Sequence, residues 1–210
     1  HPCLHPRKLC RAAASGAATR VLANDKASSV ALLGYGVQAG THLAAMRAVR
    51  DITDVWVWGP SLERAAAFAE REAAEGLEFH PVSDVDEAVA SADIVCAISN
   101  AAEPIVKGVL LKTGAHVNLV GAHSPVTREA DPDVFTRSRV FTEITEFALA
   151  EAGDLIIPIN EGTYNADEIA GEIGAVISGD LEGRQSDDQV TVYKSLGNTA
   201  QDLSAASYLA

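Results

Sequence analysis

Residues 28–50 (SSVALLGYGVQAGTHLAAMRAVR) constrain the fold more than any other part of the chain. Residues 30–33 form a short apolar run between turn residues, as expected for a buried strand. The hexapeptide GYGVQA at residues 34–39 follows at once and leads into a stretch with helical spacing of apolar residues. A strand, a glycine turn and a helix in this order are the context in which G-x-G-x-x-G/A predicts a dinucleotide-binding site.

The positions of the hexapeptide have separate expected roles. Gly34 permits the tight turn, Gly36 lets the backbone approach a pyrophosphate, and Ala39 lets the helix pack closely on the strand. The unpaired N–H groups at the helix start, where Val37 and Gln38 lie, attract phosphate. The alternative interpretation is a glycine-rich turn in another kind of α/β unit.

The rest of the chain alternates between strand and helix patterns. We expect helices over residues 7–23, 37–50, 62–75 and from 83 onward, and strands over 54–58, 77–82, 93–98, 116–120 and 139–142. This alternation predicts an α/β fold with a doubly wound parallel sheet of the Rossmann type. We assign residues 25–183 to this dinucleotide-binding domain, and residues 1–24 and 184–210 to remnants of a second domain for substrate binding and dimerisation.

Ligands of such sheets bind beyond the carboxyl ends of the strands. The loops expected there are residues 34–38, 59–61, 99–100 and 121–124. The candidate cofactor-binding residues in and around them are Gly34, Gly36, Val37, Gln38, Gly59, Ser61, Arg64, Ser99, Val120 and Gly121.

The end of the second strand discriminates between cofactors. An NAD site usually places Asp or Glu there to hold the ribose 2′-OH, but this strand ends Trp58-Gly59-Pro60-Ser61. A carboxylate would repel a 2′-phosphate, whereas Ser61 and Arg64 offer hydrogen-bond donors to it. The sequence therefore favours NADP, with NAD possible. In the alternative interpretation Arg64 is a solvated helix residue.

Composition excludes several classes of partner. The chain has 16 basic and 29 acidic residues, a net charge of −13, which argues against binding nucleic acid or an anionic membrane. No apolar run approaches membrane-spanning length, and the first residues lack the apolar core of a signal peptide. Three cysteines without a C-x-x-C pair favour a reduced cytoplasm. His1, Cys3, His5 and Cys10 match no standard zinc spacing, so no metal site is predicted.

Several segments together resemble the ornithine cyclodeaminase/mu-crystallin family. The resemblance spans nearly the whole chain after its first ten residues, and the combination of segments is specific. The segments are residues 11–14 (RAAA), 33–39 (LGYGVQA), 114–122 (GAHVNLVGA), 150–154 (AEAGD), 183–187 (GRQSD) and 194–197 (KSLG).

The resemblance implies an NAD(P)H-dependent oxidoreductase that reduces a small cyclic ketimine carboxylate, of the pyrroline- or piperideine-2-carboxylate type. Arg11 looks like the family arginine that meets the substrate carboxylate, for which a guanidinium is suited. Ser99 looks like a cofactor-contacting hydroxyl and Ser195 like one near the nicotinamide. In the alternative interpretations Arg11 lies on a helix surface and both serines are ordinary loop or capping residues. Lys194, beside Ser195, is expected to be solvated.

His123 departs from the family pattern. Cyclodeaminases of the family carry an aspartate there, so its replacement disfavours cyclodeamination and favours the ketimine reductase branch. A histidine exchanges protons near neutral pH, which suits interconversion of an imine and an amine. Alternatively, His123 only lines the pocket.

Family members also carry an N-terminal segment, which we expect to be missing here, that builds most of the substrate and dimer domain. The chain alone is then expected to bind cofactor with little turnover, and the full-length form to be a homodimer. Two rival functions remain. One is a cyclodeaminase or amino-acid dehydrogenase on the same scaffold, and the other is a non-catalytic crystallin-type protein that holds NADPH and a small ligand.

Overall fold

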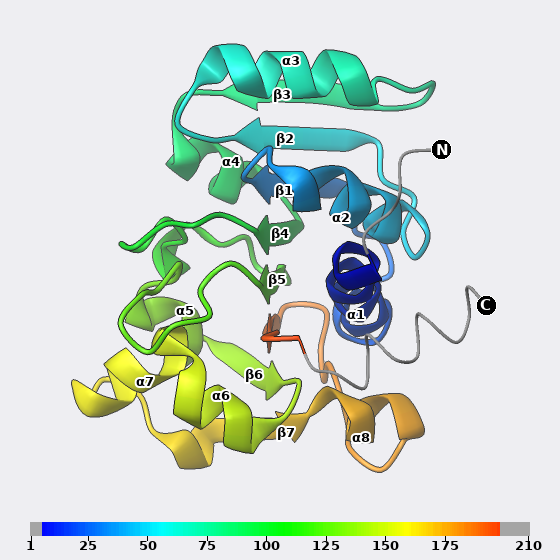
Figure 1. The fold of residues 1–210 in the computed structure, drawn as a ribbon. Coiled ribbons are helices and arrows are strands. Elements are labelled where there is room, and N and C mark those ends of the chain that lie inside the picture. The colour runs from blue at the N-terminus through cyan, green and yellow to red at the C-terminus, as the bar shows by residue number, and fades with distance from the viewer. Residues whose placement is uncertain (1–5, 198–210) are drawn as a thin grey trace.

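Eight parallel strands form one sheet (Figure 1). The computed structural model describes the backbone of residues 6–197 and the side chains of residues 10–197. The strands are β1 (Ser29–Leu33), β2 (Asp54–Trp58), β3 (Glu78–Val82), β4 (Ile94–Ala97), β5 (His116–Leu119), β6 (Ser138–Thr142), β7 (Ile169–Glu172) and β8 (Val190–Lys194). Their order is β3-β2-β1-β4-β5-β8-β6-β7, which confirms the predicted Rossmann-type sheet.

Helices cover both faces of the sheet. They are α1 (Pro6–Leu22), α2 (Val37–Arg47), α3 (Leu62–Glu72), α4 (Val85–Ser91), α5 (Pro132–Thr136), α6 (Thr145–Glu151), α7 (Gly153–Asn160) and α8 (Ile173–Ser178). Figure 1 shows α1 and α2 on one face and α4 and α5 on the other. All five residues of β1 are buried, because alternate side chains pack against helices on opposite faces. This double burial explains the unbroken apolar run in the sequence.

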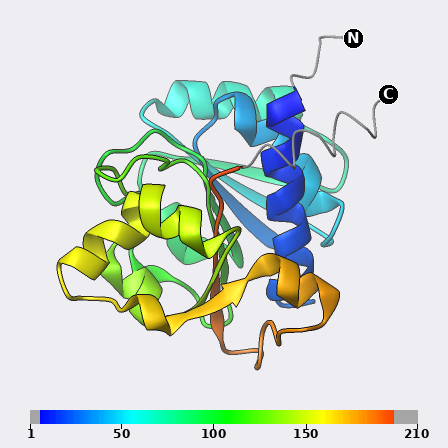
Figure 2. The same cartoon turned by 60° about the horizontal axis from the view of Figure 1, so that its bottom comes forward.

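Helix α1 lies against α2, and Figure 2 shows its far end beside α8. Gly16 lies where α1 and α2 cross: a Cβ there would be 3.3 Å from Ala45 Cβ. The glycine in the middle of this predicted helix therefore allows a close approach between the two helices. Among the described residues, no helix has the length and apolar character needed to cross a bilayer.

Strand β8 corrects the predicted domain boundary. Residues 184–210 were predicted to belong to the second domain, yet β8 pairs with β5 on one side and with β6 on the other, inside the same sheet. Residues 191–194 are buried, so the segment is part of the core of the dinucleotide-binding fold. The proposed second-domain residues 198–210, and the histidines and cysteine at positions 1, 3 and 5, lie outside the described residues.

A buried polar layer joins α1 to the rest of the fold. The Ser15 hydroxyl lies 3.3 Å from Nε2 of His42, whose Nδ1 lies 2.9 Å from the Gln38 carbonyl oxygen. The Asn118 amide donates to Thr19 Oγ1 at 3.0 Å. Burial lowers the pKa of His42 to about 4, so its imidazole is neutral at physiological pH.

The pKa of His42 predicts a pH-dependent contribution to stability. Between its folded pKa of about 4 and an ordinary value of about 6.5, the unfolded chain binds more protons than the folded one. The contribution of His42 to the free energy of unfolding is therefore at its maximum above about pH 6.5. It falls as the pH drops, by at most about 1.4 kcal/mol per pH unit. We expect the free-energy advantage of the wild type over His42→Gln in urea unfolding to shrink from about pH 7 to about pH 5. An advantage independent of pH would contradict the assignment.

Candidate active site

The carboxyl ends of β1, β2, β4, β5 and β8 meet at one edge of the sheet. The chain proceeds from β1 toward β2 and β3 on one side, whereas β4 and β5 lie on the other, so the order of strands reverses between β1 and β4. A crevice at this reversal is the usual binding place of a dinucleotide. The predicted cofactor-binding residues all lie in the loops of this edge or in the first turn of a following helix: Gly34, Gly36, Val37, Gln38, Gly59, Ser61, Arg64, Ser99, Val120, Gly121 and Ser195.

The turn between β1 and α2 forms a cradle suited to phosphate. Gly34 has φ +126°, a conformation that L side chains rarely adopt, and a Cβ there would lie 3.0 Å from the Ile98 carbonyl oxygen. Gly36 precedes α2 as its N-cap, without a side-chain hydrogen bond to the helix. A Cβ at Gly36 would meet no atom within 4 Å, so the space above this glycine is open. Open space at a helix N-terminus fits a bound pyrophosphate.

Tyr35 connects this turn to the loop after β2. Its hydroxyl oxygen accepts a hydrogen bond from the Ser61 backbone N–H at 3.1 Å, and its ring leaves no room for a Cβ at Gly59. The Arg64 guanidinium lies 5.1 Å from the ring centroid. Tyr35 was not predicted as a site residue because it occupies a variable position of the fingerprint. The sequence feature that could have indicated it is the pairing of a large side chain at position 35 with a glycine at position 59, since the tyrosine ring leaves no room for a side chain there.

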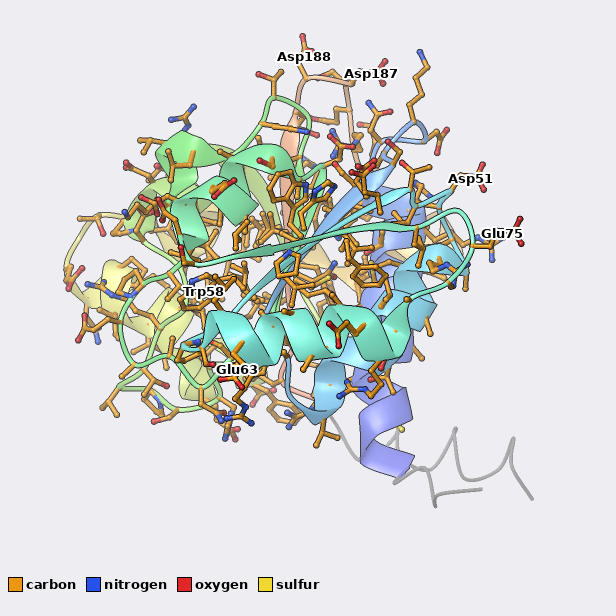
Figure 3. All side chains as sticks on the ribbon, turned by 90° about the horizontal axis from the view of Figure 1, so that it is seen from above. Asp51, Trp58, Glu63, Glu75, Asp187 and Asp188 are labelled. Atoms are coloured by element: carbon orange, nitrogen blue, oxygen red, sulfur yellow. The ribbon has the colours of Figure 1, made fainter. Side chains whose placement is uncertain are left out.

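Exposed acidic residues lie at the amino ends of several strands. Figure 3 shows Trp58 and Glu63 at one end of β2 and α3, with Asp51 and Glu75 at the other end. Asp187 and Asp188 are likewise exposed in the turn that precedes β8, and so belong to the amino edge of the sheet. Several acidic groups therefore lie at the edge opposite the candidate phosphate site.

The buried carboxylate of Glu129 joins the loops that follow β4 and β5. Oε1 accepts hydrogen bonds from the Ser99 backbone N–H at 2.9 Å and from its hydroxyl at 2.7 Å. Oε2 accepts from the backbone N–H groups of Gly121 at 2.6 Å and Ala122 at 3.1 Å. The Ser99 hydroxyl, expected to contact cofactor, thus donates to Glu129, while its oxygen accepts from the Ala101 N–H at 3.0 Å.

A buried ion pair between Lys194 and Asp154 contacts the backbone of Glu129. Lys194 Nζ lies 2.8 Å from Asp154 Oδ2, with both side chains fully buried, and donates to the Ala122 carbonyl oxygen at 2.6 Å. Asp154 Oδ1 accepts from the backbone N–H groups of Glu129 at 2.7 Å and Ala130 at 3.2 Å. Burial, together with the neighbouring charge of Asp154, raises the pKa of Glu129. The expectation of a solvated Lys194 is therefore wrong, since its position in β8 directs it into the core.

The residues expected on the substrate side come to the same edge. A Cβ at Gly197, in the loop after β8, would lie 3.1 Å from Arg11 Nε, so this arginine lies against that loop. Ser195 is buried, and its hydroxyl lies 3.5 Å from Glu143 Oε2. His123 is exposed in the loop after β5, with Nδ1 2.8 Å from the Gly121 carbonyl oxygen. Because a carbonyl only accepts, Nδ1 carries the hydrogen and Nε2 is the nitrogen left for proton exchange.

One group of potential metal ligands is found among the described residues, away from this edge. Ligand atoms of Asp54, Glu78 and His80 lie within 4.8 Å of one another. Asp54 and Glu78 are the first residues of β2 and β3, so the group lies at the amino edge of the sheet. His80 is already paired with Asp54 at 3.1 Å.

A family model described as the ornithine cyclodeaminase/mu-crystallin family matches residues 8–210. The chain belongs to the ornithine cyclodeaminase/mu-crystallin family. This membership confirms the resemblance drawn from the fingerprint and the five other segments.

Proteins similar to this chain include reductases. A Delta(1)-pyrroline-2-carboxylate reductase of Bacillus cereus is 38% identical over 199 residues, which cover 94% of this chain and 61% of the reductase. The structure of the Thermococcus litoralis Delta(1)-pyrroline-2-carboxylate reductase, in complex with NADH and L-proline, has a TM-score of 0.93 at 33% identity and covers 96% of this chain and 63% of that one. An archaeal alanine dehydrogenase dimer with bound NAD has a TM-score of 0.88 at 28% identity, covering 94% of this chain and 61% of that chain. The chain thus spans about three fifths of the length of these relatives.

Proposed function

We propose that this protein is an NAD(P)H-dependent oxidoreductase that reduces a small cyclic ketimine carboxylate, of the pyrroline- or piperideine-2-carboxylate type, to the cyclic amino acid. The observation that carries the proposal is the close fold similarity to a reductase whose structure is in complex with NADH and L-proline. That similarity covers 96% of this chain.

The cofactor site is proposed to be the edge around Gly36. The open space above this glycine and the uncapped start of α2 fit a pyrophosphate, while the loop after β2 fits the adenosine ribose. The loops after β4, β5 and β8 are left for the nicotinamide half. When bound there, the reduced nicotinamide supplies a hydride to the imine carbon.

Arg11 and His123 are the proposed substrate residues. Arg11 lies against the loop after β8, where its guanidinium would bind the ketimine carboxylate in a bidentate manner. Reduction of a C=N bond also requires one proton at nitrogen. Nε2 of His123 would supply or relay that proton, since its Nδ1 is engaged with the Gly121 carbonyl.

We expect tighter binding of NADPH than of NADH. No carboxylate follows β2 at the usual position for the ribose 2′-OH, and Arg64 lies exposed beside Tyr35 at the start of α3. A charge-assisted bond from Arg64 to a 2′-phosphate would contribute about 1.5–3 kcal/mol, or roughly 10- to 100-fold in affinity. Arg64→Ala is expected to weaken NADPH binding by such a factor and to leave the dissociation constant of NADH unchanged.

The matched control for Arg64 is Arg71→Ala. Arg71 lies on the same helix over the Phe68 ring, 5.0 Å from its centroid, but in the last turn. NADH binding as tight as NADPH binding in the wild type would show that the loop after β2 does not select the phosphate.

Steady-state kinetics of the protein expressed from its complete coding sequence test the proposed activity. We expect NADPH oxidation with 1-pyrroline-2-carboxylate, and no comparable turnover with ornithine or with alanine and NAD. Ammonia release from ornithine would favour the cyclodeaminase, and NAD reduction with alanine the amino-acid dehydrogenase. Tight NADPH binding with no turnover of any substrate would favour the non-catalytic protein.

A cytoplasmic location and a homodimer are further parts of the proposal. Cys96 is buried as a free thiol, as expected for a reducing compartment. The alanine dehydrogenase relative is described as a dimer, which supports a homodimer of the whole protein.

A further inference from the structure

We propose that Glu129 is a positioning residue that sets the geometry of the nicotinamide half of the cofactor site. The inference rests on the proposed function, because it assigns the loops after β4 and β5 to that half. Glu129 itself is fully buried and does not face the open edge.

The hydrogen bonds that its carboxylate accepts from described residues come from those two loops. Three backbone N–H groups and one hydroxyl converge on its two oxygens, at 2.6–3.1 Å. Gly121 shows how closely the loops approach: a Cβ there would collide with the Ser99 carbonyl oxygen and with the Glu129 carboxylate itself. The spacing between the two loops is therefore fixed by the carboxylate that lies between them.

An ionised carboxylate suits this place because it only accepts hydrogen bonds and has about four lone-pair sites. The four donors match this capacity. A glutamine of the same shape would present an NH₂ group to at least one of these donors, with which it has no hydrogen bond to form. The loops would then separate or rotate by enough to disturb whatever they position.

The buried network around Glu129 also includes the loop after β8, the third loop assigned to the nicotinamide half. Asp154 fixes the Glu129 backbone, and Lys194 links Asp154 to the Ala122 carbonyl oxygen. Lys194 directly precedes Ser195, so the loop after β8 joins the same buried network. Within the part of the chain that the structure describes, the hydrogen bonds of this network do not reach the turn at Gly34–Gly36 or the loop after β2, which are assigned to the adenosine half.

This separation predicts different effects of Glu129→Gln on the two halves. Fluorescence or calorimetric titration should show NADPH binding weakened at least tenfold. The fragment 2′,5′-ADP, which lacks the nicotinamide riboside and its phosphate, should bind within about twofold of the wild type. The matched control is Glu161→Gln. Glu161 is exposed and lies 3.0 Å from Arg128, the residue that directly precedes Glu129. This substitution should alter neither affinity.

Amide hydrogen exchange without ligand provides a second measurement. Exchange at Ser99, Gly121 and Ala122 should accelerate in Glu129→Gln, and that in β1 and α2 should not. Ser99→Ala, which removes one of the four bonds, should produce a smaller change of the same kind if Glu129→Gln folds poorly.

Two results would overturn the inference. The first is that Glu129→Gln weakens the binding of NADPH and of 2′,5′-ADP equally, or weakens neither. The second is an unchanged rate of amide exchange in both loops. If the wild type bound neither nucleotide, the proposed function would fail, whereas the exchange data would still decide whether Glu129 fixes the loops.

Discussion

Gly36→Asp is expected to abolish dinucleotide binding without unfolding the protein. The open space above Gly36 is where the pyrophosphate is proposed to lie, and an aspartate would place both atoms and a negative charge in it. The fold itself should tolerate the change, because Gly36 has φ −76° and occupies the N-cap of α2, where aspartate is a favoured residue. We therefore expect no measurable NADPH affinity, together with a Tm that is unchanged or slightly raised.

Gly174→Asp is the matched control for Gly36→Asp. Gly174 lies in the first turn of α8, following β7 at the far end of the sheet, and a Cβ there also meets no atom within 4 Å. The same charge in the first turn of this other helix should leave NADPH binding intact. A folded Gly36→Asp variant that binds NADPH normally would show that the cofactor does not use this turn.

Lys194→Met is expected to destabilise the fold by about 3–5 kcal/mol, a loss of roughly 10 °C in Tm. The substitution leaves the Asp154 carboxylate buried beside Glu129 with its counter-charge removed, and it also frees the Ala122 carbonyl oxygen. Urea unfolding followed by circular dichroism measures the free-energy change directly.

An exposed ion pair supplies the comparison for Lys194. Lys107 lies 2.6 Å from Asp86, but both side chains are partly solvated. Lys107→Met should leave the free energy of unfolding essentially unchanged, since solvent screens such pairs. If Lys194→Met were equally harmless, the buried network would not stabilise the fold.

The sheet could be predicted from the sequence where strand patterns were undisturbed. The run at residues 30–33 and the hexapeptide after it fixed the first strand–turn–helix unit, and the structure places both as expected. Strands β7 and β8 were missed for a physical reason. Strand β7 is four residues long and contains Gly171, while β8 (VTVYK) ends in a lysine that the pattern assigns to the surface.

Residues that act through buried polar contacts were also missed. Glu129 follows Arg128 in a polar loop, and nothing in that stretch indicates a carboxylate with no exposed surface. Its burial depends on donors that come from residues 99 and 121–122, which only the fold brings together. The fingerprint glycines are recognisable because their role is local, whereas the role of Glu129 depends on the arrangement of three strands.

Isotope transfer tests the central claim most directly. The protein expressed from its complete coding sequence is incubated with 1-pyrroline-2-carboxylate and NADPH that carries deuterium at both C4 positions of the nicotinamide, and the product is analysed by mass spectrometry and NMR. A dinucleotide-dependent ketimine reductase yields proline with one deuterium at Cα. Absence of proline, or proline without deuterium at Cα, would contradict the proposed function.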